Sequence, residues 1–170
     1  MRPAPQTPNP PRPDMTPAAL TLPLADVEAT ERLAAAVAAR ARPGDAIALS
    51  GELGAGKSTF ARAFVRARTG TAEDVPSPTF TLVQTYPDPA GDIWHVDLYR
   101  IESPDDAEEL GLAEAFSQAI VLIEWPDRLA GQLPADRLEI MFDYGDEEDR
   151  RIARIRGQGN WAGRLDGIAA

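Results

Sequence analysis

One segment constrains the fold of this 170-residue chain more than any other. Residues 51–58 read GELGAGKS and fit the phosphate-binding pattern G-x-x-x-x-G-K-[ST] in full. The pattern works between a buried strand and a helix, because main-chain N–H groups of the loop and of the helix N-terminus close around phosphate oxygens. Residues 46–50 are apolar and follow a Pro-Gly-Asp turn signal, whereas residues 58–68 have helical spacing and are followed by Gly70. The sequence therefore predicts a strand, a phosphate loop and a helix that together bind a nucleoside triphosphate.

Lys57 is the only lysine in the chain, and every other basic side chain is an arginine. A compact ammonium on a long stem reaches between phosphates better than a planar guanidinium does. We therefore predict a catalytic role for Lys57 at the outer phosphates and a magnesium-ligating role for Ser58. An ordinary glycine-rich turn is the alternative, and the flanking strand and helix argue against it. The predicted nucleotide contacts of the loop come from Gly51, Gly54, Ala55, Gly56, Lys57, Ser58 and Thr59.

Helical segments alternate with apolar strands along the rest of the chain. The expected helices span residues 27–41 and 103–116, and the expected strands span residues 46–50, 79–86, 93–99, 119–123, 137–143 and 150–156. The run 119–123 is the most apolar and predicts a central parallel strand. Two antiparallel hairpins are expected, one from residues 79–86 and 93–99 and one from residues 137–143 and 150–156. This pattern predicts an α/β layered fold of the P-loop NTPase type, with a mainly parallel central sheet and antiparallel hairpins. Ligand is expected beyond the carboxyl ends of the parallel strands.

Composition sets the expected domain limits. Residues 1–20 are expected to form a disordered, proline-rich tail, to which we assign no role, because this stretch is rich in proline and poor in apolar residues. A P-loop ATPase domain is expected over residues 21–157, and a frayed C-terminal tail over residues 158–170, part of which Trp161 could anchor. The chain has no signal-peptide pattern and no cysteine, and it offers no stretch long enough to span a membrane, which together favour a cytoplasmic protein.

The formal net charge of −10 argues against strong direct binding of nucleic acid, because phosphate contacts need clustered basic side chains. Arginines do gather over residues 150–156, directly beside an acidic stretch over residues 143–149. We interpret these residues as solvated strand faces around a charged turn. The acidic surplus could alternatively serve docking on a basic partner protein.

A triphosphate site also needs a metal-binding acid and a group that positions the attacking water. Glu124 directly follows the apolar run and is predicted to bind magnesium. Asp97 shares a strand face with His95 and could order a magnesium-bound water or polarise the attacking water. His95 itself is left out of catalysis. Thr79 is the third predicted catalytic residue and lies in the segment Ser77-Pro78-Thr79. This segment is either a switch whose hydroxyl senses magnesium and the terminal phosphate or an ordinary turn.

The sequence offers two candidate segments for contacts to the base. Trp125 could stack on a base or pack the strand end. The segment from Trp125 to Arg128 is one candidate for binding adenine, and residues 26–30 are another. Whether Arg100 or Arg128 neutralises charge in the transition state stays open at this point.

With these pieces in order, the chain resembles the bacterial TsaE family over about residues 22–156. Beyond the phosphate loop, the resemblance is carried by SPTFTLV at residues 77–83, HVDLYR at residues 95–100 and IEWP at residues 123–126. Ser58 stands where many members have threonine. The resemblance implies a small ATPase that uses ATP and Mg²⁺ and is weak alone. It also implies that the protein works with the proteins TsaD and TsaB in making threonylcarbamoyladenosine beside the tRNA anticodon, with Asp97 and Glu124 serving hydrolysis and metal binding.

Two other functions remain open at this level. One is a small-molecule kinase, although no long insertion after Glu124 could supply a lid over an acceptor. The other is a switch that binds nucleotide without hydrolysing it. A GTPase is disfavoured, because Asn-Lys-x-Asp recognition of guanine is impossible when the only lysine is Lys57.

Overall fold

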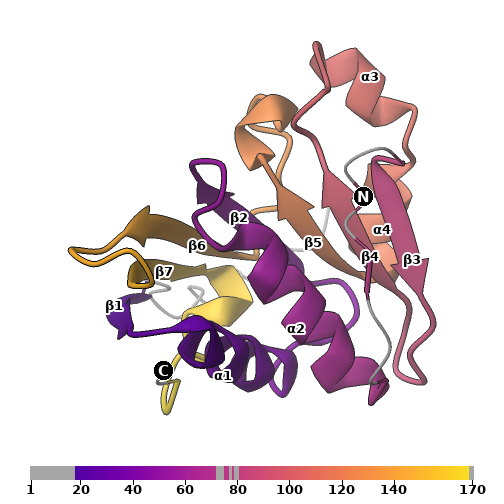
Figure 1. Ribbon diagram of the computed structural model, residues 1–170. Coiled ribbons are helices and arrows are strands. Elements are labelled where there is room, and N and C mark those ends of the chain that lie inside the picture. Colours follow the sequence, from indigo (N-terminus) through magenta and orange to yellow (C-terminus); the bar gives the residue numbers. More distant parts are fainter. Residues whose placement is uncertain (1–17, 72–74, 77, 79–80, 169–170) are drawn as a thin grey trace, which may run out of the picture.

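The chain is built around a seven-stranded sheet with the strand order β1-β7-β6-β2-β5-β4-β3 (Figure 1). The structure is a computed structural model and describes residues 18–71, 75–76, 78 and 81–168. The four central strands run parallel, whereas β1, β7 and β3 pair antiparallel to their neighbours. This arrangement confirms the predicted α/β layered fold with a mainly parallel centre and antiparallel hairpins. The strands are β1 (Ala18–Leu24), β2 (Ala46–Gly51), β3 (Val83–Tyr86), β4 (Ile93–Asp97), β5 (Ile120–Glu124), β6 (Arg137–Tyr144) and β7 (Arg151–Gln158).

Local sequence signals explain where the helices begin and end. Asp26 caps α1 by accepting a hydrogen bond from the Ala29 N–H at 2.8 Å, and Gly70 ends α2 in the left-handed conformation. The expected single helix over residues 103–116 is wrong, because Gly111 adopts φ 75° and divides it in two. The helices are α1 (Val27–Ala38), α2 (Lys57–Thr69), α3 (Pro104–Glu108) and α4 (Leu112–Gln118), with short 3₁₀ turns η1 (Pro126–Leu129) and η2 (Gly159–Trp161).

Helices cover the two faces of the sheet unequally (Figure 1). On one face α1 and α2 pack on β2, β5 and β6, and this layer holds the larger apolar core. On the other face α4 and η1 pack over β4 and β5 around a smaller core. The carboxyl ends of β2, β4 and β5 meet at one edge, so side chains at these strand ends are brought together there.

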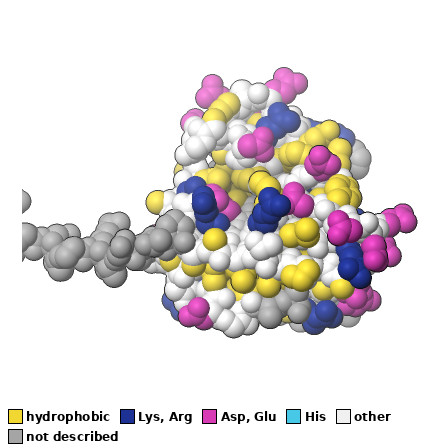
Figure 2. Space-filling view, turned by 90° about the vertical axis from the view of Figure 1, so that its left-hand side faces the viewer, with side chains coloured by type: hydrophobic (Ala, Val, Ile, Leu, Met, Phe, Trp, Pro, Cys, Tyr) yellow, Lys and Arg dark blue, Asp and Glu magenta, His cyan; other side chains and the backbone are white. Residues whose placement is uncertain are grey.

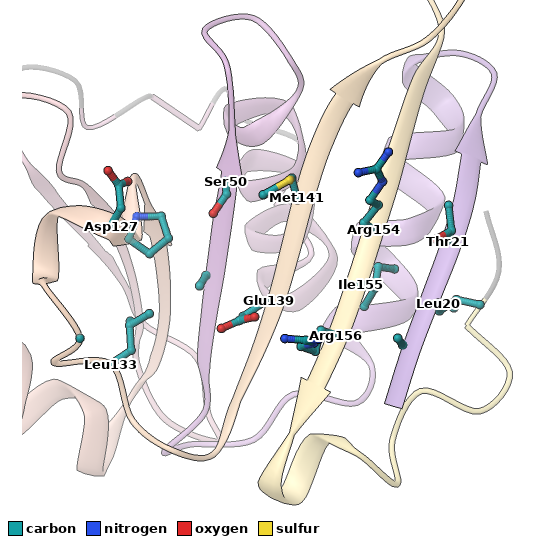
Figure 3. A pocket seen from close by; sticks show the side chains of 14 residues that line it. Leu20, Thr21, Ser50, Asp127, Leu133, Glu139, Met141, Arg154, Ile155 and Arg156 are labelled. Atoms are coloured by element: carbon teal, nitrogen blue, oxygen red, sulfur yellow. The ribbon is translucent and has the colours of Figure 1, made fainter. Parts of the chain in front are cut away.

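The second face of the sheet also carries an open hollow of about 530 Å³ over β1, β7, β6 and β2. Figure 3 views this hollow with α1 and α2 behind the sheet, and shows Ser50, Glu139, Met141, Arg154 and Arg156 on its floor. The Glu139 carboxylate pairs with the Arg137 guanidinium at 2.7 Å, so opposite charges meet on this face. The face in Figure 2 likewise shows Lys and Arg side chains interspersed with Asp and Glu rather than gathered in one basic patch.

The two ends of the domain differ from expectation. β1 begins at Ala18 and pairs with β7 along its whole length, so the sheet includes residues that were assigned to the N-terminal tail. Residues 159–168 are not frayed: the Trp161 side chain is fully buried, and Leu165 and Ile168 join the larger core. The reason is a polar clamp in which Arg164 donates to both carboxylate oxygens of Asp45 at 2.7 Å.

Replacing Arg164 should therefore destabilise the protein. Arg164→Met leaves the mostly buried Asp45 carboxylate without its bidentate partner, and it also removes the guanidinium that lies 4.0 Å from the centre of the Trp161 ring. We expect the free energy of unfolding in urea to fall by about 2–4 kcal/mol. Arg154→Met is the matched control, because its pair with Asp143 is exposed and should contribute under about 1 kcal/mol. Equal losses of unfolding free energy in the two variants would show that the Arg164–Asp45 pair does not hold the C-terminal segment in place.

Candidate functional site

The phosphate loop joins β2 to α2 and takes a shape that favours glycine at three positions. Gly51, Gly54 and Gly56 have φ values of 137°, 78° and 121°, in the region that other residues rarely adopt. A Cβ atom at Gly51 would also lie 2.5 Å from the Phe142 carbonyl oxygen on β6. Because β2 and β6 run parallel, their ends meet at this edge, and the loop lies directly against β6.

Lys57 begins α2 and points back into the loop. Its ammonium donates to the carbonyl oxygens of Gly51 at 2.5 Å and Glu52 at 2.8 Å, and lies 4.3 Å from the centre of the Trp125 ring. Burial lowers the pKa of Lys57, while the neighbouring carboxylates of Glu124 and Asp97 act in the opposite direction. An anionic ligand would therefore meet a cation held by weak acceptors, which phosphate oxygens can replace.

Ser58, Glu124 and His95 form a connected chain of polar contacts across the site. The Ser58 hydroxyl donates to Glu124 Oε1 at 2.8 Å, and Glu124 Oε2 lies 2.7 Å from His95 Nε2. Both Glu124 and His95 are buried. The sequence placed Glu124 and Ser58 together, but it gave no reason to connect His95 to either of them. His95 and Asp97 share one face of β4 and Asp97 is the register partner of Glu124, but this register is visible only in the structure.

Asp97 ends β4 beside Glu124 at the end of β5. Its carboxylate Oδ1 accepts a hydrogen bond from the Tyr99 N–H at 3.0 Å, which turns the chain and ends the strand two residues earlier than expected. Burial raises the pKa of Asp97 above its ordinary value. The Tyr99 hydrogen bond lowers that pKa, and Glu124 raises it further. A carboxylate held in this way is a stronger proton acceptor than an exposed aspartate.

These groups surround one hollow of about 330 Å³ at the carboxyl edge of the sheet. Its aromatic wall is formed by Trp125 and Tyr99, whose ring centres lie 5.0 Å apart. Trp125 has φ 59° and ψ 54°, a left-handed backbone that a bulky residue adopts at a cost, and this conformation brings its ring over Lys57. The hollow is lined by Leu53, Gly54, Gly56, Lys57, Ser58, Thr59, Arg62, Asp97, Tyr99, Arg100, Glu124 and Trp125.

Most residues that the sequence nominated thus meet at this hollow, with some differences. Gly51 and Ala55 belong to the loop without lining the hollow. Arg128 does not line it either, since it lies on η1 and its guanidinium donates to the Ile101 carbonyl oxygen at 3.5 Å. Thr79 falls outside the described residues. Arg62 was missed as a lining residue, although its position one helical turn after Ser58 could have indicated it.

The oxygen donors at the hollow fit a magnesium ion. Mg²⁺ keeps several waters and takes few protein ligands beside substrate phosphates, so a hydroxyl and a carboxylate suffice. Ser58 and Glu124 supply that pair 2.8 Å apart. Within the described ranges, no group of three or more His, Cys, Asp or Glu is arranged to hold a metal ion by itself. A metal here would depend on the phosphates of a bound nucleotide.

The order of these residues agrees with one family of known proteins. The family model described as threonylcarbamoyl adenosine biosynthesis protein TsaE matches residues 24–152. The chain belongs to the TsaE family. The tRNA threonylcarbamoyladenosine biosynthesis protein TsaE of Bacillus subtilis is 41% identical over 126 residues, which cover 74% of this chain and 78% of that protein. The TsaE protein of Rickettsia bellii is 39% identical over 77% of this chain and 90% of its own length.

One solved structure resembles this chain in fold as well as in sequence. The crystal structure of Bacillus subtilis YdiB superimposes with a TM-score of 0.75 and 32% identity, covering 90% of this chain and 95% of that one. The predicted family and the P-loop NTPase fold are both confirmed. Family membership places the chain in tRNA threonylcarbamoyladenosine biosynthesis and indicates nucleotide binding.

Proposed function

We propose that this member of the TsaE family is a magnesium-dependent ATPase that TsaD and TsaB activate during threonylcarbamoylation of the tRNA adenosine next to the anticodon. One observation carries the proposal: Lys57, Ser58, Asp97 and Glu124 converge on one hollow at the phosphate loop. A loop with a phosphate-binding cation, a metal-binding pair and a separate carboxylate has the parts that hydrolysis of a triphosphate requires.

Each residue has a distinct task in this proposal. Main-chain N–H groups of Gly54 and of residues 56–59 bind phosphate oxygens at the N-terminus of α2, whereas the Ala55 N–H donates to the Glu52 carbonyl oxygen at 3.1 Å. Lys57 compensates charge on the outer phosphates. Ser58 and Glu124 hold Mg²⁺, which neutralises charge on the phosphates when bound. Asp97 accepts a hydrogen bond from the attacking water and orients it, and the raised pKa of its carboxyl suits that task.

His95 and Trp125 support these groups without touching the reacting atoms. His95 holds Glu124 from behind through the 2.7 Å contact, so the other carboxylate oxygen stays directed at Ser58. Trp125 lies on Lys57 at the mouth of the hollow, where its ring can meet a base or shield the phosphates from water. We do not assign Arg128 a contact with the nucleotide, because its guanidinium is directed to Ile101.

The proposal also concerns partners and place of action. The net charge of −10 and the interspersed charges in Figure 2 favour docking on the partner proteins over direct binding of tRNA. Within the described part of the chain, no helix is long and apolar enough to cross a bilayer. We further propose, from the role of the family in tRNA threonylcarbamoyladenosine biosynthesis, that the protein acts in the cytoplasm beside TsaD and TsaB.

Titration calorimetry with ATP and GTP tests the proposal most directly. In the presence of Mg²⁺, ATP should bind more tightly than GTP. EDTA should weaken ATP binding at least about tenfold by removing the metal that Ser58 and Glu124 would hold. Hydrolysis measured in parallel should be slow for the protein alone and rise when TsaD and TsaB are added. Phosphoryl transfer to a metabolite would favour a kinase instead. Negligible single-turnover hydrolysis with both partners present would favour a non-hydrolysing switch.

A further inference from the structure

The outer side of the phosphate loop is held by the end of the β6–β7 hairpin. Tyr144 and Arg151 are the last residue pair of this hairpin and lie directly opposite each other. The Tyr144 hydroxyl donates to the Leu53 carbonyl oxygen at 2.5 Å, and Arg151 Nη2 donates to the Gly54 carbonyl oxygen at 3.3 Å. Two consecutive peptide groups of the loop are therefore bound from one side by the hairpin.

The two side chains also hold each other. The Arg151 guanidinium carbon lies 4.5 Å from the centre of the Tyr144 ring. Arg151 Nη1 further donates to the carbonyl oxygens of Glu148 at 2.6 Å and Arg150 at 2.8 Å, so the guanidinium ties the hairpin turn to the loop. The Arg151 rotamer is thus fixed by contacts that do not depend on the loop, and the Tyr144 ring packs against this guanidinium.

The hydrogen bond from Tyr144 to the Leu53 carbonyl oxygen also affects the direction of the next N–H group in the loop. In a trans peptide the C=O and the following N–H point in opposite directions from one plane. A Leu53 carbonyl directed at Tyr144 therefore turns the Gly54 N–H away from β6. In the sheet β6 lies on one side of β2, and β5, which carries Glu124 and ends beside Trp125, lies on the other. Because Gly54 also lines the hollow, an N–H that points away from β6 is available to a phosphate bound there.

We propose that Tyr144 and Arg151 are positioning residues that preorganise the phosphate loop by fixing its Leu53 and Gly54 peptide groups. The inference rests on the proposed function in one respect, since the ligand that benefits is the phosphate chain of a nucleotide. Glycine at residue 54 lets the Tyr144 hydroxyl approach the loop this closely, because a Cβ there would lie 3.0 Å from that hydroxyl. The sequence showed only a charged turn at this place, and no loop motif includes a residue from this hairpin.

Tyr144→Phe and Arg151→Met test the proposal, with Arg150→Met as the matched control. Arg150 lies on the same hairpin, but its side chain pairs with Glu147 at 3.3 Å and not with the loop. In titrations with MgADP, we expect each test variant to bind about 3- to 10-fold more weakly, the effect of losing one hydrogen bond. Steady-state hydrolysis should show a raised KM for ATP and a kcat within about twofold of the parent, because ground-state and transition-state binding are lost together. Arg151→Lys should restore part of the affinity.

Hydrogen exchange of the protein without nucleotide gives a second, independent measurement. The backbone amides of residues 51–56 should exchange about 3- to 10-fold faster in Tyr144→Phe and Arg151→Met, and at the parental rate in Arg150→Met. Parental exchange in both test variants would overturn the proposal. A parent protein that binds no MgADP would instead refute the proposed function, while the exchange data would still decide whether the hairpin holds the loop. An unchanged unfolding midpoint in urea should exclude a general loss of stability as the cause.

Discussion

Lys57→Ala is expected to lower ATP hydrolysis by about 10²–10³-fold, even with TsaD and TsaB present. The ammonium is the one cation that the loop directs inward, and its carbonyl partners Gly51 and Glu52 hold it beside the hollow. Removing a preorganised charge from a buried site costs far more than the same change at the surface. Phosphate release assays with the reconstituted proteins measure this effect.

Lys57→Arg is the informative companion variant. It keeps the charge and replaces a compact ammonium with a larger planar guanidinium, which cannot take the ammonium's place between the Gly51 and Glu52 carbonyl oxygens without moving the loop. We expect a loss within about tenfold of that of Lys57→Ala. Parental hydrolysis in Lys57→Ala would remove the catalytic role from this residue.

The composition of the chain allows a direct chemical check of the same assignment. Because Lys57 is the only lysine, an acyl-phosphate derivative of ATP can acylate one lysine side chain and the terminal amine. Mass spectrometry should find residue 57 modified, and excess MgADP should suppress that modification while leaving the terminal amine unaffected. Modification of residue 57 that resists MgADP would contradict a nucleotide site at the loop.

The fold could be predicted where short segments carry their own signals. The phosphate loop requires a strand and a helix on either side, and residues 46–51 and 57–69 supply them nearly as expected. Apolar runs gave the parallel centre of the sheet for the same reason, because strands buried on both faces cannot alternate polar and apolar residues. Gly111 was harder to interpret, since a glycine inside a helical pattern can be tolerated or can break the helix, and here its positive φ breaks it.

The site could be predicted only as far as its residues follow strand ends. Asp97 and Glu124 end neighbouring parallel strands, so their meeting follows from topology. The contact between His95 and Glu124 and the hold of Tyr144 on Leu53 depend on register and rotamer across distant segments. The packed tail over residues 159–168 was missed because the partner of Arg164 is Asp45, more than a hundred residues earlier. Short-range patterns contain no information on such pairs.

Asp97→Asn and Glu124→Gln should both lower hydrolysis by about 10²–10³-fold, but for different reasons. Asp97→Asn removes the group that accepts a hydrogen bond from the attacking water, so the affinity for MgADP should stay within about threefold. Glu124→Gln removes the carboxylate that faces Ser58, so MgADP should bind at least about tenfold more weakly and require more Mg²⁺. Asp143→Asn and Glu139→Gln are the isosteric controls, because neither carboxylate lines the nucleotide hollow.

Asp97→Asn should also make the protein more stable at neutral pH. Burial raises the pKa of the folded-state carboxyl above its value in the unfolded chain, so the folded protein binds this proton more tightly. Ionised Asp97 therefore opposes folding above the folded-state pKa, and this cost disappears as the pH falls toward the ordinary aspartate value. Urea unfolding of the parent and of Asp97→Asn at several pH values should show a difference in favour of the variant that shrinks on acidification. A difference that instead grew on acidification would mean that Asp97 is stabilised in its charged form, and the argument for its strengthened basicity would fail.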